Sequence, residues 1–474
     1  MRLPALFRVP AATRKDVFKL VGPVMLEQLL ISSMGVVGMV LASRLGKDAV
    51  TPIGMVDALH FLFMLFFTSV ASGATVIVAQ HYGRGEVASA NEVARQAMAT
   101  SVAIAVALVG ILFFTGVPLV DLLYGKQSAE IAAGIPQYLI PSLFSYPALA
   151  IVTTGCGVLR GSGDTRTPMS ITTLMGLLNM ALSALLIYGV DFNLFGLHIY
   201  IPRFGVMGAA LAILIARIVG AVLISYVLLK GQRVIRVSFK AFRVRMDVQR
   251  ALFAIGIPVT AESVLFQVGK LITSIIIVSC GTTHVNANII AGSVFSLICI
   301  PGNAFAVAVM PIVGQSVGKC DYPDARERLL FVNWMSSLGL LLTNALMAAL
   351  AWPLAYLYTT DAEVAAITVQ MLYVVAVFMP ISWSASFVLP AGLRGAGDTN
   401  YSMVTSIIGM WLFRVLLGYI LGILCQMGAV GIYLAMCTDW LVRGTLYYIR
   451  VRGSRWYGKS AKLAIRLSES EPAE

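Results

Sequence analysis

Charged and catalytic residues are scarce in this sequence. Asp, Glu, Lys and Arg together make up only 12% of the 474 residues, and there are four histidines. The six cysteines form no CxxC pair and no Cys/His spacing typical of a metal site. An enzyme would need clustered acids, a His/Asp pair or a metal triad, and the histidines here are isolated from one another. The composition therefore argues against an enzyme, and it predicts no cofactor and no certain metal site.

Long apolar runs are abundant, because 59% of the residues are hydrophobic. Twelve runs reach the ~20 residues that a helix needs to cross the hydrocarbon core of a bilayer. They cover residues 17–43, 52–79, 95–120, 130–158, 167–189, 206–229, 251–278, 286–316, 328–356, 362–391, 401–424 and 428–449. Such continuous runs differ from the alternating pattern of a membrane barrel. The sequence predicts an all-α integral membrane protein with twelve transmembrane helices.

Three motifs occur twice, at a spacing of 234 or 235 residues. They are Pro-x-x-x-Glu at 23–27 and 258–262, Gln-x-x-Gly at 80–83 and 315–318, and Leu-Arg-Gly-x-Gly-Asp-Thr at 159–165 and 393–399. Membrane proteins built from two like-oriented halves usually place a substrate path between them, so the repeat predicts a transporter. We expect an N-lobe at 1–230, a basic cytoplasmic linker at 231–250, a C-lobe at 251–450 and a cytoplasmic tail at 451–474.

The distribution of the net charge of +12 predicts how the helices are oriented. Most of the 34 lysines and arginines fall in the termini, the linker and alternate short loops, and the positive-inside rule assigns these segments to the cytoplasm. In the linker, Phe239 and Phe242 accompany the basic residues, which suits an anionic lipid surface better than nucleic acid. We expect a monomeric multi-pass protein of a prokaryotic inner membrane, with both termini cytoplasmic and no nucleic-acid partner.

The repeated glycine motifs fit turns at the cytoplasmic ends of helices. Glycine permits left-handed backbone there, Asp or Thr caps the next helix, and Arg160 and Arg394 complement the negative end of the preceding helix. A phosphate-binding loop is rejected, because no strand precedes Leu-Arg-Gly-x-Gly-Asp-Thr and no Gly-Lys-Ser/Thr follows it. Gly83 and Gly318 of the Gln-x-x-Gly motifs are expected to stop their helices in the same way.

Glu27 and Glu262 are the strongest candidates for function. Each lies four residues after a proline inside an apolar run, where an ionised carboxylate is costly. Proline removes a backbone hydrogen bond and frees a carbonyl that needs a partner. Each acid either braces its helix by donating to that carbonyl, or binds a proton, a cation or cargo. The functional interpretation is favoured, because intramembrane acids are functional by default.

Further charged residues lie inside the apolar runs. Asp439 and Arg443 stand at i and i+4 on one helix face, which predicts an ion pair. Arg414 competes for Asp439, and this structural charged group is expected to fix helix packing at least as readily as to bind substrate. Lys270 lies two turns after Glu262, so it either neutralises that acid or lines the cavity and disfavours cationic cargo.

Together these residues resemble the multidrug and toxic compound extrusion (MATE) transporters of the multidrug/oligosaccharidyl-lipid/polysaccharide superfamily, over about residues 15–460. The matching features are Pro-x-x-x-Glu-Gln-Leu-Leu at 23–30, Arg-Leu-Gly at 44–46, Gln-x-x-Gly at 80–83, the Leu-Arg-Gly-x-Gly-Asp-Thr turn, Gly-Val-Met-Gly-Ala-Ala at 205–210, Trp-x-x-Arg at 411–414 and Asp-Trp at 439–440. The resemblance implies two six-helix lobes arranged as an open V, which export organic, often cationic compounds against inward flow of H⁺ or Na⁺. It also implies that Glu262 is a cation-coupling residue.

The chain departs from the family pattern in its N-lobe. Many relatives carry acids in the first and fifth helices, and here Gly38 and Ser183 stand in their places. Asn179 of the fifth-helix motif is kept, and it stays in the predicted set of ion-coupling or substrate-binding residues. Coupling is therefore expected to rest on Glu262, on Glu27 or on both.

These observations predict a secondary antiporter that exports small organic compounds in exchange for H⁺ or Na⁺ by alternating access. We expect these compounds to be cationic and amphipathic. Ser263 and Gln267 would complete an oxygen cage for Na⁺ at Glu262, whereas a lone acid suits H⁺ better. One alternative is a flippase or exporter of lipid-linked saccharide or another amphipathic anion, with Lys270 and the intramembrane arginines as its candidate contacts. Another is a passive channel, which the two-lobe repeat disfavours.

Overall fold

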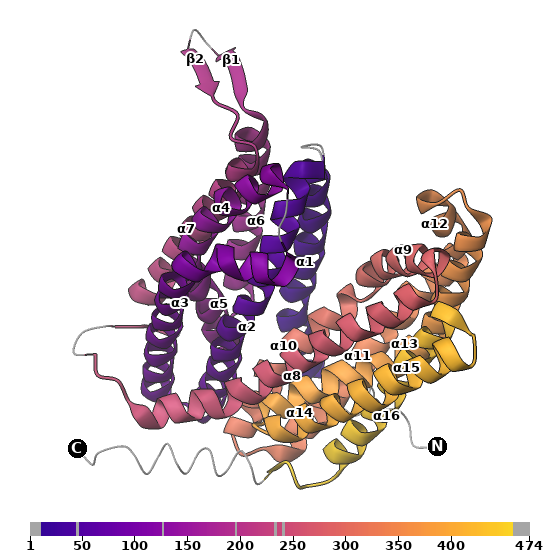
Figure 1. Ribbon diagram of the computed structural model, residues 1–474. Helices are drawn as coiled ribbons and strands as arrows, with labels where there is room; N and C mark the ends of the chain where they lie inside the picture. Colours follow the sequence, from indigo (N-terminus) through magenta and orange to yellow (C-terminus); the bar gives the residue numbers. More distant parts are fainter. Residues whose placement is uncertain are drawn as a thin grey trace. The chain divides into compact units, whose positions relative to one another are not determined.

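The computed structural model describes residues 11–43, 47–125, 128–194, 197–231, 235–238 and 242–457. All twelve predicted apolar runs are helical within these ranges (Figure 1). The predicted motif at 44–46, the linker residues 232–234 and 239–241, and the predicted tail after residue 457 lie outside them. The helices are α1 (Ala11–Ser43), α2 (Lys47–Arg84), α3 (Val87–Tyr124), α4 (Ala129–Phe144), α5 (Tyr146–Gly161), α6 (Arg166–Tyr188), α7 (Val206–Lys230), α8 (Met246–Ser279), α9 (Thr282–Ile298), α10 (Ile300–Gly318), α11 (Tyr322–Ala349), α12 (Ala351–Tyr358), α13 (Ala362–Gly395), α14 (Thr399–Ile408), α15 (Leu417–Tyr419) and α16 (Gly428–Arg452), with π-helical turns η2 (Gly409–Leu416) and η3 (Ile420–Leu424) on either side of α15.

Three of the predicted runs are broken helices. The run 130–158 divides at Ser145 into α4 and α5, with a bend of 47°. The run 286–316 divides at Cys299 into α9 and α10. In both cases a proline stands at the start of the second helix, where it lacks the N–H that would continue the first helix. The run 328–356 divides at Leu350 between α11 and α12.

Ten of the described helices are long and apolar enough to cross a membrane, and eleven are if α4 and α5 form one span. These numbers are consistent with the predicted twelve. The helix α16 is not among them, because Asp439 and Arg443 lie inside it and lower its hydropathy.

A β-hairpin between α6 and α7 is an addition to the predicted all-α fold (Figure 1). Strands β1 (Val190–Leu194) and β2 (Leu197–Ile201) pair antiparallel, with Val190 opposite Ile201 and Leu194 opposite Leu197. The helix before it ends because Gly189 adopts a φ of 70°, which suits glycine. The alternating Val-Asp-Phe-Asn-Leu at 190–194 then has the two-residue period of a strand.

The chain divides into two compact units. We call the described parts of 1–25, 79–86 and 257–474 the C-terminal unit, and the described parts of 26–78 and 87–256 the N-terminal unit. The boundaries fall inside α1, α2 and α8, so these three helices contribute to both units. The lobe, linker and tail boundaries expected from the sequence stay predictions.

The two Gln-x-x-Gly repeats pack against each other inside the C-terminal unit. A Cβ atom on Gly83 would lie 2.2 Å from the carbonyl oxygen of Gln315, and one on Gly318 would lie 2.1 Å from that of Gln80. Real Cβ contacts are not this short, so α2 and α10 approach each other at a distance that only glycine allows.

The turns of the repeated motifs follow the prediction in one case and differ in the other. Gly163 (φ 89°) and Gly397 (φ 86°) are left-handed, as expected of Leu-Arg-Gly-x-Gly-Asp-Thr. The expectation that Gly83 stops its helix is wrong, because α2 continues to Arg84 and the left-handed residue is Gly85 (φ 82°). The glycine at position 83 is needed for packing rather than for the turn.

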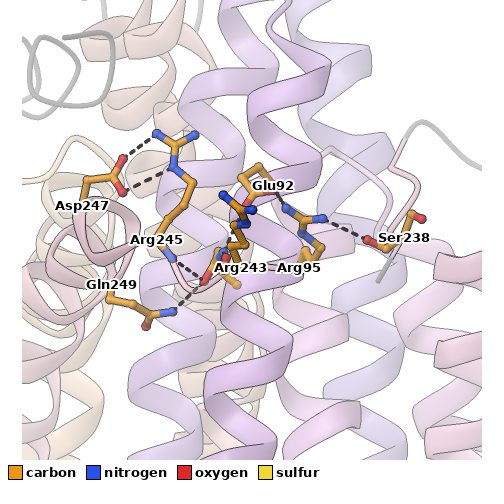
Figure 2. Close-up of polar contacts among 8 residues, drawn as sticks. Glu92, Arg95, Ser238, Arg243, Arg245, Asp247 and Gln249 are labelled. Atoms are coloured by element: carbon orange, nitrogen blue, oxygen red, sulfur yellow. Dashed lines mark hydrogen bonds and ion pairs between the residues drawn. The ribbon is translucent and has the colours of Figure 1, made fainter. Parts of the chain in front are cut away.

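The described part of the predicted linker is bound to the start of α3 (Figure 2). The amide of Gln96, which is buried, donates to the carbonyl oxygen of Arg243 at 2.6 Å and accepts from the backbone N–H of Arg245 at 3.3 Å. Gln249 donates to the same amide oxygen at 3.1 Å, and Arg245 pairs with Asp247 at 2.6 Å. These bonds fix the polypeptide that leads into α8 to the N-terminal unit.

Candidate ion and substrate site

Glu27 lies in a closed polar site in the N-terminal unit. It follows Pro23 by four residues in α1, and only 2% of its side chain is exposed. Arg160, in the last turn of α5, places Nη2 2.6 Å from Glu27 Oε1. Thr172 of α6 donates its hydroxyl to the same oxygen at 3.0 Å. The buried carboxylate is thus balanced by a guanidinium and a hydroxyl.

Glu262 lies in an equivalent site in the C-terminal unit. Arg394, in the last turn of α13, places Nη1 3.1 Å from Glu262 Oε2. Ser406 of α14 donates to Oε1 at 2.7 Å, and Ser402 donates to Oε2 at 3.4 Å. The hydroxyl of Tyr447 lies 2.8 Å from that of Ser406, so the tyrosine helps to hold the serine in place.

The two sites are copies of each other within the sequence repeat. Arg160 and Arg394 are 234 residues apart, and so are Thr172 and Ser406. Both arginines lie at the helix ends where the turn motif predicts them, but their guanidinium groups contact the acids. Within the described residues, the hydrogen bonds of both acids run to Arg, Thr and Ser side chains, which does not support the alternative in which each acid donates to the carbonyl freed by its proline.

A cavity of about 170 Å³ borders the Glu262 site. Glu262 has 13% of its side chain exposed, against the 2% of Glu27. The residues lining the cavity are Glu262, Ser263, Phe266, Ser386, Phe387, Pro390, Arg394 and Arg443. They come from α8, α13 and α16, and they combine one acid, two guanidinium groups, two hydroxyls and two aromatic rings. Such a mixture of apolar walls and a few polar groups is typical of a small-molecule site.

The predicted pair of Asp439 and Arg443 is present in α16, with Arg443 Nε 2.8 Å from Asp439 Oδ1. Both side chains are almost fully buried. The guanidinium of Arg443 lies over the rings of Phe266 and Phe387, at 5.5 and 5.2 Å from their centres. The Arg414 guanidinium also lies over the Phe266 ring, 5.5 Å from its centre, and it interacts electrostatically with Asp439. Of these residues, Arg443, Phe266 and Phe387 line the cavity.

The other residues predicted for the site are not brought to the cavity. Gln267 and Lys270 lie further along α8, and neither lines it. Ser263 lines the cavity, but its hydroxyl donates to the carbonyl of Val259 at 2.9 Å. Asn179 lies in α6 of the N-terminal unit, where its buried Oδ1 has no partner among the described residues.

Sequence reasoning missed the groups that hold Glu262 and wall its cavity. Arg394, Ser402, Ser406, Phe266 and Phe387 were assigned no part in the site. A signal for the arginine was available, because both acids and both motif arginines recur at nearly the same spacing. Helical periodicity relates neighbours on one helix only, so it could not bring α8 together with α13 and α14.

Two helical repeats with paired intramembrane acids define a membrane transporter. The family model MatE matches the chain twice, at residues 23–185 and 258–420, which is the same 235-residue repeat. The chain belongs to this family, whose members are transporters rather than enzymes. The predicted family and the predicted multi-pass membrane fold are thereby confirmed.

Several relatives match this chain over nearly its whole length. It is 27% identical over 453 residues to the uncharacterised transporter YisQ of Bacillus subtilis (strain 168), covering 95% of this chain and 96% of that protein. It is 26% identical over 463 residues to the probable multidrug resistance protein NorM of Thermotoga maritima, covering 96% of each. The coarse assignment is therefore a MATE-family transporter similar to probable multidrug-efflux proteins.

Solved structures show the same fold. A MATE crystal structure in the bent conformation superposes with a TM-score of 0.83 at 19% identity, covering 95% of this chain and 97% of that one. A transporter of the same superfamily from Pyrococcus furiosus, whose binding pocket is described as having reverse polarity, superposes with a TM-score of 0.82 at 19% identity, with the same coverage. At this identity the likeness concerns the fold alone.

Proposed function

We propose that this protein is a secondary antiporter that exports amphipathic organic compounds in exchange for protons, with Glu262 as the coupling carboxylate. The observation that carries the proposal is that Glu262 combines a partly buried arginine partner with a cavity large enough to admit a ligand group. Its copy Glu27 has the partner but is almost completely buried. Of the two acids, Glu262 is therefore the one that a proton and a cargo can both reach.

In this proposal, the guanidinium of Arg394 competes with a cationic cargo for the carboxylate of Glu262. While the cavity is empty, this guanidinium balances Glu262 at 3.1 Å, so the carboxylate stays ionised without a bound ion. A cationic cargo entering from the cytoplasm displaces Arg394 from Glu262. A proton arriving from outside neutralises the carboxylate and removes its attraction for the cargo, which is then released. Since the coupling is reciprocal, cargo binding must equally expel the proton.

The contacts of Glu262 favour a proton over Na⁺ as the coupling ion. A hard cation needs several oxygen ligands. Glu262 instead has a guanidinium and two donating serine hydroxyls around it, and a metal cation would be repelled by Arg394 at this distance. The residues predicted for a Na⁺ cage do not support one, because Gln267 does not line the cavity and Ser263 donates to its own helix.

The cavity walls suit an amphipathic cargo. Phe266, Phe387 and Pro390 offer apolar surface beside the charged groups. The relatives named as probable multidrug resistance proteins support an organic cargo. We further propose a location in a prokaryotic inner membrane with both termini in the cytoplasm, on the basis of the positive-inside charge distribution and brief loops. The protein is proposed to work as a monomer.

The test is dye efflux from proteoliposomes under an imposed pH gradient or an imposed Na⁺ gradient. We expect a fluorescent lipophilic cation to leave only with the pH gradient, and Glu262→Gln to reduce this efflux to the rate of protein-free vesicles. Glu27→Gln, compared at equal amounts of folded protein, should retain it. Efflux driven by Na⁺ alone, or unchanged efflux in Glu262→Gln, would overturn the proposal.

A second candidate function is export of an amphipathic anion, including a lipid-linked saccharide. The observation in its favour is the surplus of positive charge in the C-terminal unit, where Arg394 and Arg443 line the cavity and Arg414 contacts the Phe266 ring that lines it as well. Arg443 Nη2 is buried and has no hydrogen-bond partner among the described residues. The same vesicles, loaded with an anionic amphiphile, decide between the two candidate functions. If the anion is transported and the cation is not, and if Arg443→Gln abolishes this transport, the second candidate is selected.

A further inference from the structure

A second cluster of polar side chains lies in the N-terminal unit, the part of the chain in which Gly38 and Ser183 replace the acids of many relatives. Its side chains come from four helices and from the break between two of them. They are Asp57 and His60 of α2, Tyr138 of α4, Ser145 between α4 and α5, Tyr146 of α5 and Arg217 of α7. Neither the proposed transport site nor the repeat accounts for them.

The polar side chains of α2 are held by two tyrosines. The hydroxyl of Tyr138 donates to Asp57 Oδ1 at 2.9 Å. The hydroxyl of Tyr146 lies 2.6 Å from His60 Nδ1, and the two rings meet edge to face at 5.4 Å between centres. Both tyrosines are almost fully buried, so these contacts are made in an apolar environment where they are strong.

Arg217 supplies the positive charge of the cluster. Its guanidinium interacts electrostatically with Asp57, and its Nη1 donates to the hydroxyl of Ser145 at 2.6 Å. Ser145 is the residue at which α4 and α5 break with a bend of 47°. A charged group bound at a discontinuous helix is the arrangement in which transporters build ion sites. The charge state of this cluster therefore bears directly on a bend in the bundle.

Asp57 is exposed although it lies in the second turn of the apolar span that begins at Thr51. A charged carboxylate on such a span faces water or a partner rather than lipid. Among the described residues, Arg217 supplies the positive charge that balances it. Loss of the negative charge on Asp57 would leave Arg217 uncompensated beside the broken helix, which is a strong electrostatic change in a buried region.

We propose that Asp57 is a second exchangeable proton-binding carboxylate of this transporter, and that Tyr138 and Arg217 are its positioning residues. The proton comes from water on the side to which Asp57 is accessible, binds a carboxylate oxygen, and returns to water when the carboxylate is ionised again. The ionised form is stabilised by the Tyr138 hydroxyl and the Arg217 charge. Among the described residues, the titratable groups that interact with it are Tyr138, Tyr146 and Arg217, and His60 lies one turn further along α2. This inference extends the proposed proton coupling to the N-terminal unit.

Infrared difference spectroscopy of the purified full-length protein, between acidic and alkaline buffer, tests the site without relying on transport. A protonated carboxyl group gives a carbonyl band that disappears on ionisation. We expect Asp57→Asn to lose one such band that wild type shows. The matched control Asp121→Asn, which changes an exposed acid near the end of α3, should keep it. An Asp57→Asn spectrum identical to that of wild type would overturn the proposal.

Tyr138→Phe keeps the site testable if Asp57→Asn does not fold. It leaves the carboxylate in place and removes its hydrogen-bond donor, so the carbonyl band of Asp57 should change in frequency. A spectrum without a shifted band would contradict the assignment. This variant also separates proton binding from a merely structural role. A carbonyl band that shifts when the Tyr138 hydroxyl is removed must come from a protonated carboxyl group beside Tyr138, whereas a role in packing alone would produce no such band.

Proton counting during transport measures the contribution of the site. With a pH-sensitive dye inside the vesicles, Asp57→Asn is expected to move one proton fewer per cargo molecule than wild type, while Glu262→Gln moves no cargo. An unchanged ratio in Asp57→Asn would overturn the coupling role. If Glu262→Gln still transports normally, the proposed function fails, and the infrared result continues to decide whether Asp57 binds a proton.

Discussion

The Glu27 site and the Glu262 site belong to equivalent positions of the sequence repeat, but the two carboxylates differ in exposure. Both acids follow a proline by four residues, and both pair with the arginine of a repeated turn. Glu27 is closed in, with its arginine at 2.6 Å, whereas Glu262 is partly exposed at a cavity, with its arginine at 3.1 Å. The difference teaches that the presence of a charged acid inside the membrane does not by itself show that the acid takes part in transport. Access to a cavity separates a brace from a candidate coupling group.

Glu27→Gln should give the largest change in stability. It leaves Arg160 charged and without its partner in a buried site, and breaking a buried pair in this way costs about 3–5 kcal/mol. Thermal unfolding in detergent should therefore begin at a clearly lower temperature than in wild type. The double variant Glu27→Gln/Arg160→Gln should recover part of the loss. A single variant as stable as wild type would show that the pair is not a brace.

Arg394→Gln should give the second largest effect, and this effect should differ from that of the equivalent change at Arg160. Because Glu262 borders a cavity, losing its partner should cost less stability than at Glu27, about 1–3 kcal/mol. Because the Arg394 guanidinium no longer competes for Glu262, the variant should bind a cationic cargo more tightly and release it more slowly. Fluorescence titration with the cargo and initial efflux rates measure the two effects. Arg160→Gln is the matched control, and an equal change in cargo affinity there would contradict the comparison.

Phe387→Ala should weaken cargo binding with little effect on coupling. The ring lines the cavity beside Arg443, and loss of an aromatic contact of this kind costs about 1 kcal/mol in binding. The proton-to-cargo ratio should stay that of wild type. Phe114→Ala removes an exposed ring in the N-terminal unit and serves as the control. Equal cargo affinities in the two variants would place the cargo elsewhere.

Ser406→Ala and Thr172→Val form the smallest matched pair. Each removes one hydroxyl that donates to its glutamate, which typically costs about 1 kcal/mol of stability. Only Ser406→Ala should also alter the pH profile of efflux, because only Glu262 is proposed to exchange its proton during transport. Efflux at a series of external pH values measures this. A shifted profile in Thr172→Val alone would reverse the roles of the two sites.

The helices and the repeat could be predicted from the sequence because both are local signals. Apolar runs of membrane length stand out against 12% charged residues, and the i, i+4 spacing of Asp439 and Arg443 correctly predicted an ion pair. The breaks at Ser145 and Cys299 were missed, although a proline at the start of the second helix marks each of them. The hairpin was missed because five residues of strand alternation stand beside long helical runs.

The partners of the acids could not be predicted because they depend on tertiary packing. Arg394 is 132 residues from Glu262, and Arg160 is 133 residues from Glu27. At such separations a charged residue offers no periodic signal, and the helix-end role expected for the arginines was consistent with their position. Asp57 escaped notice for the same reason. It became a candidate only when Tyr138 and Arg217 were seen beside it.

The most direct test of the central claim is the affinity for a cationic cargo, measured as a function of pH on purified protein. If proton and cargo compete for Glu262, binding by wild type should weaken steadily as the pH falls. Glu262→Gln should bind weakly and show no pH dependence, and Glu27→Gln should follow wild type. A Glu262→Gln protein whose affinity keeps the pH dependence of wild type would contradict the claim that Glu262 couples proton binding to cargo binding.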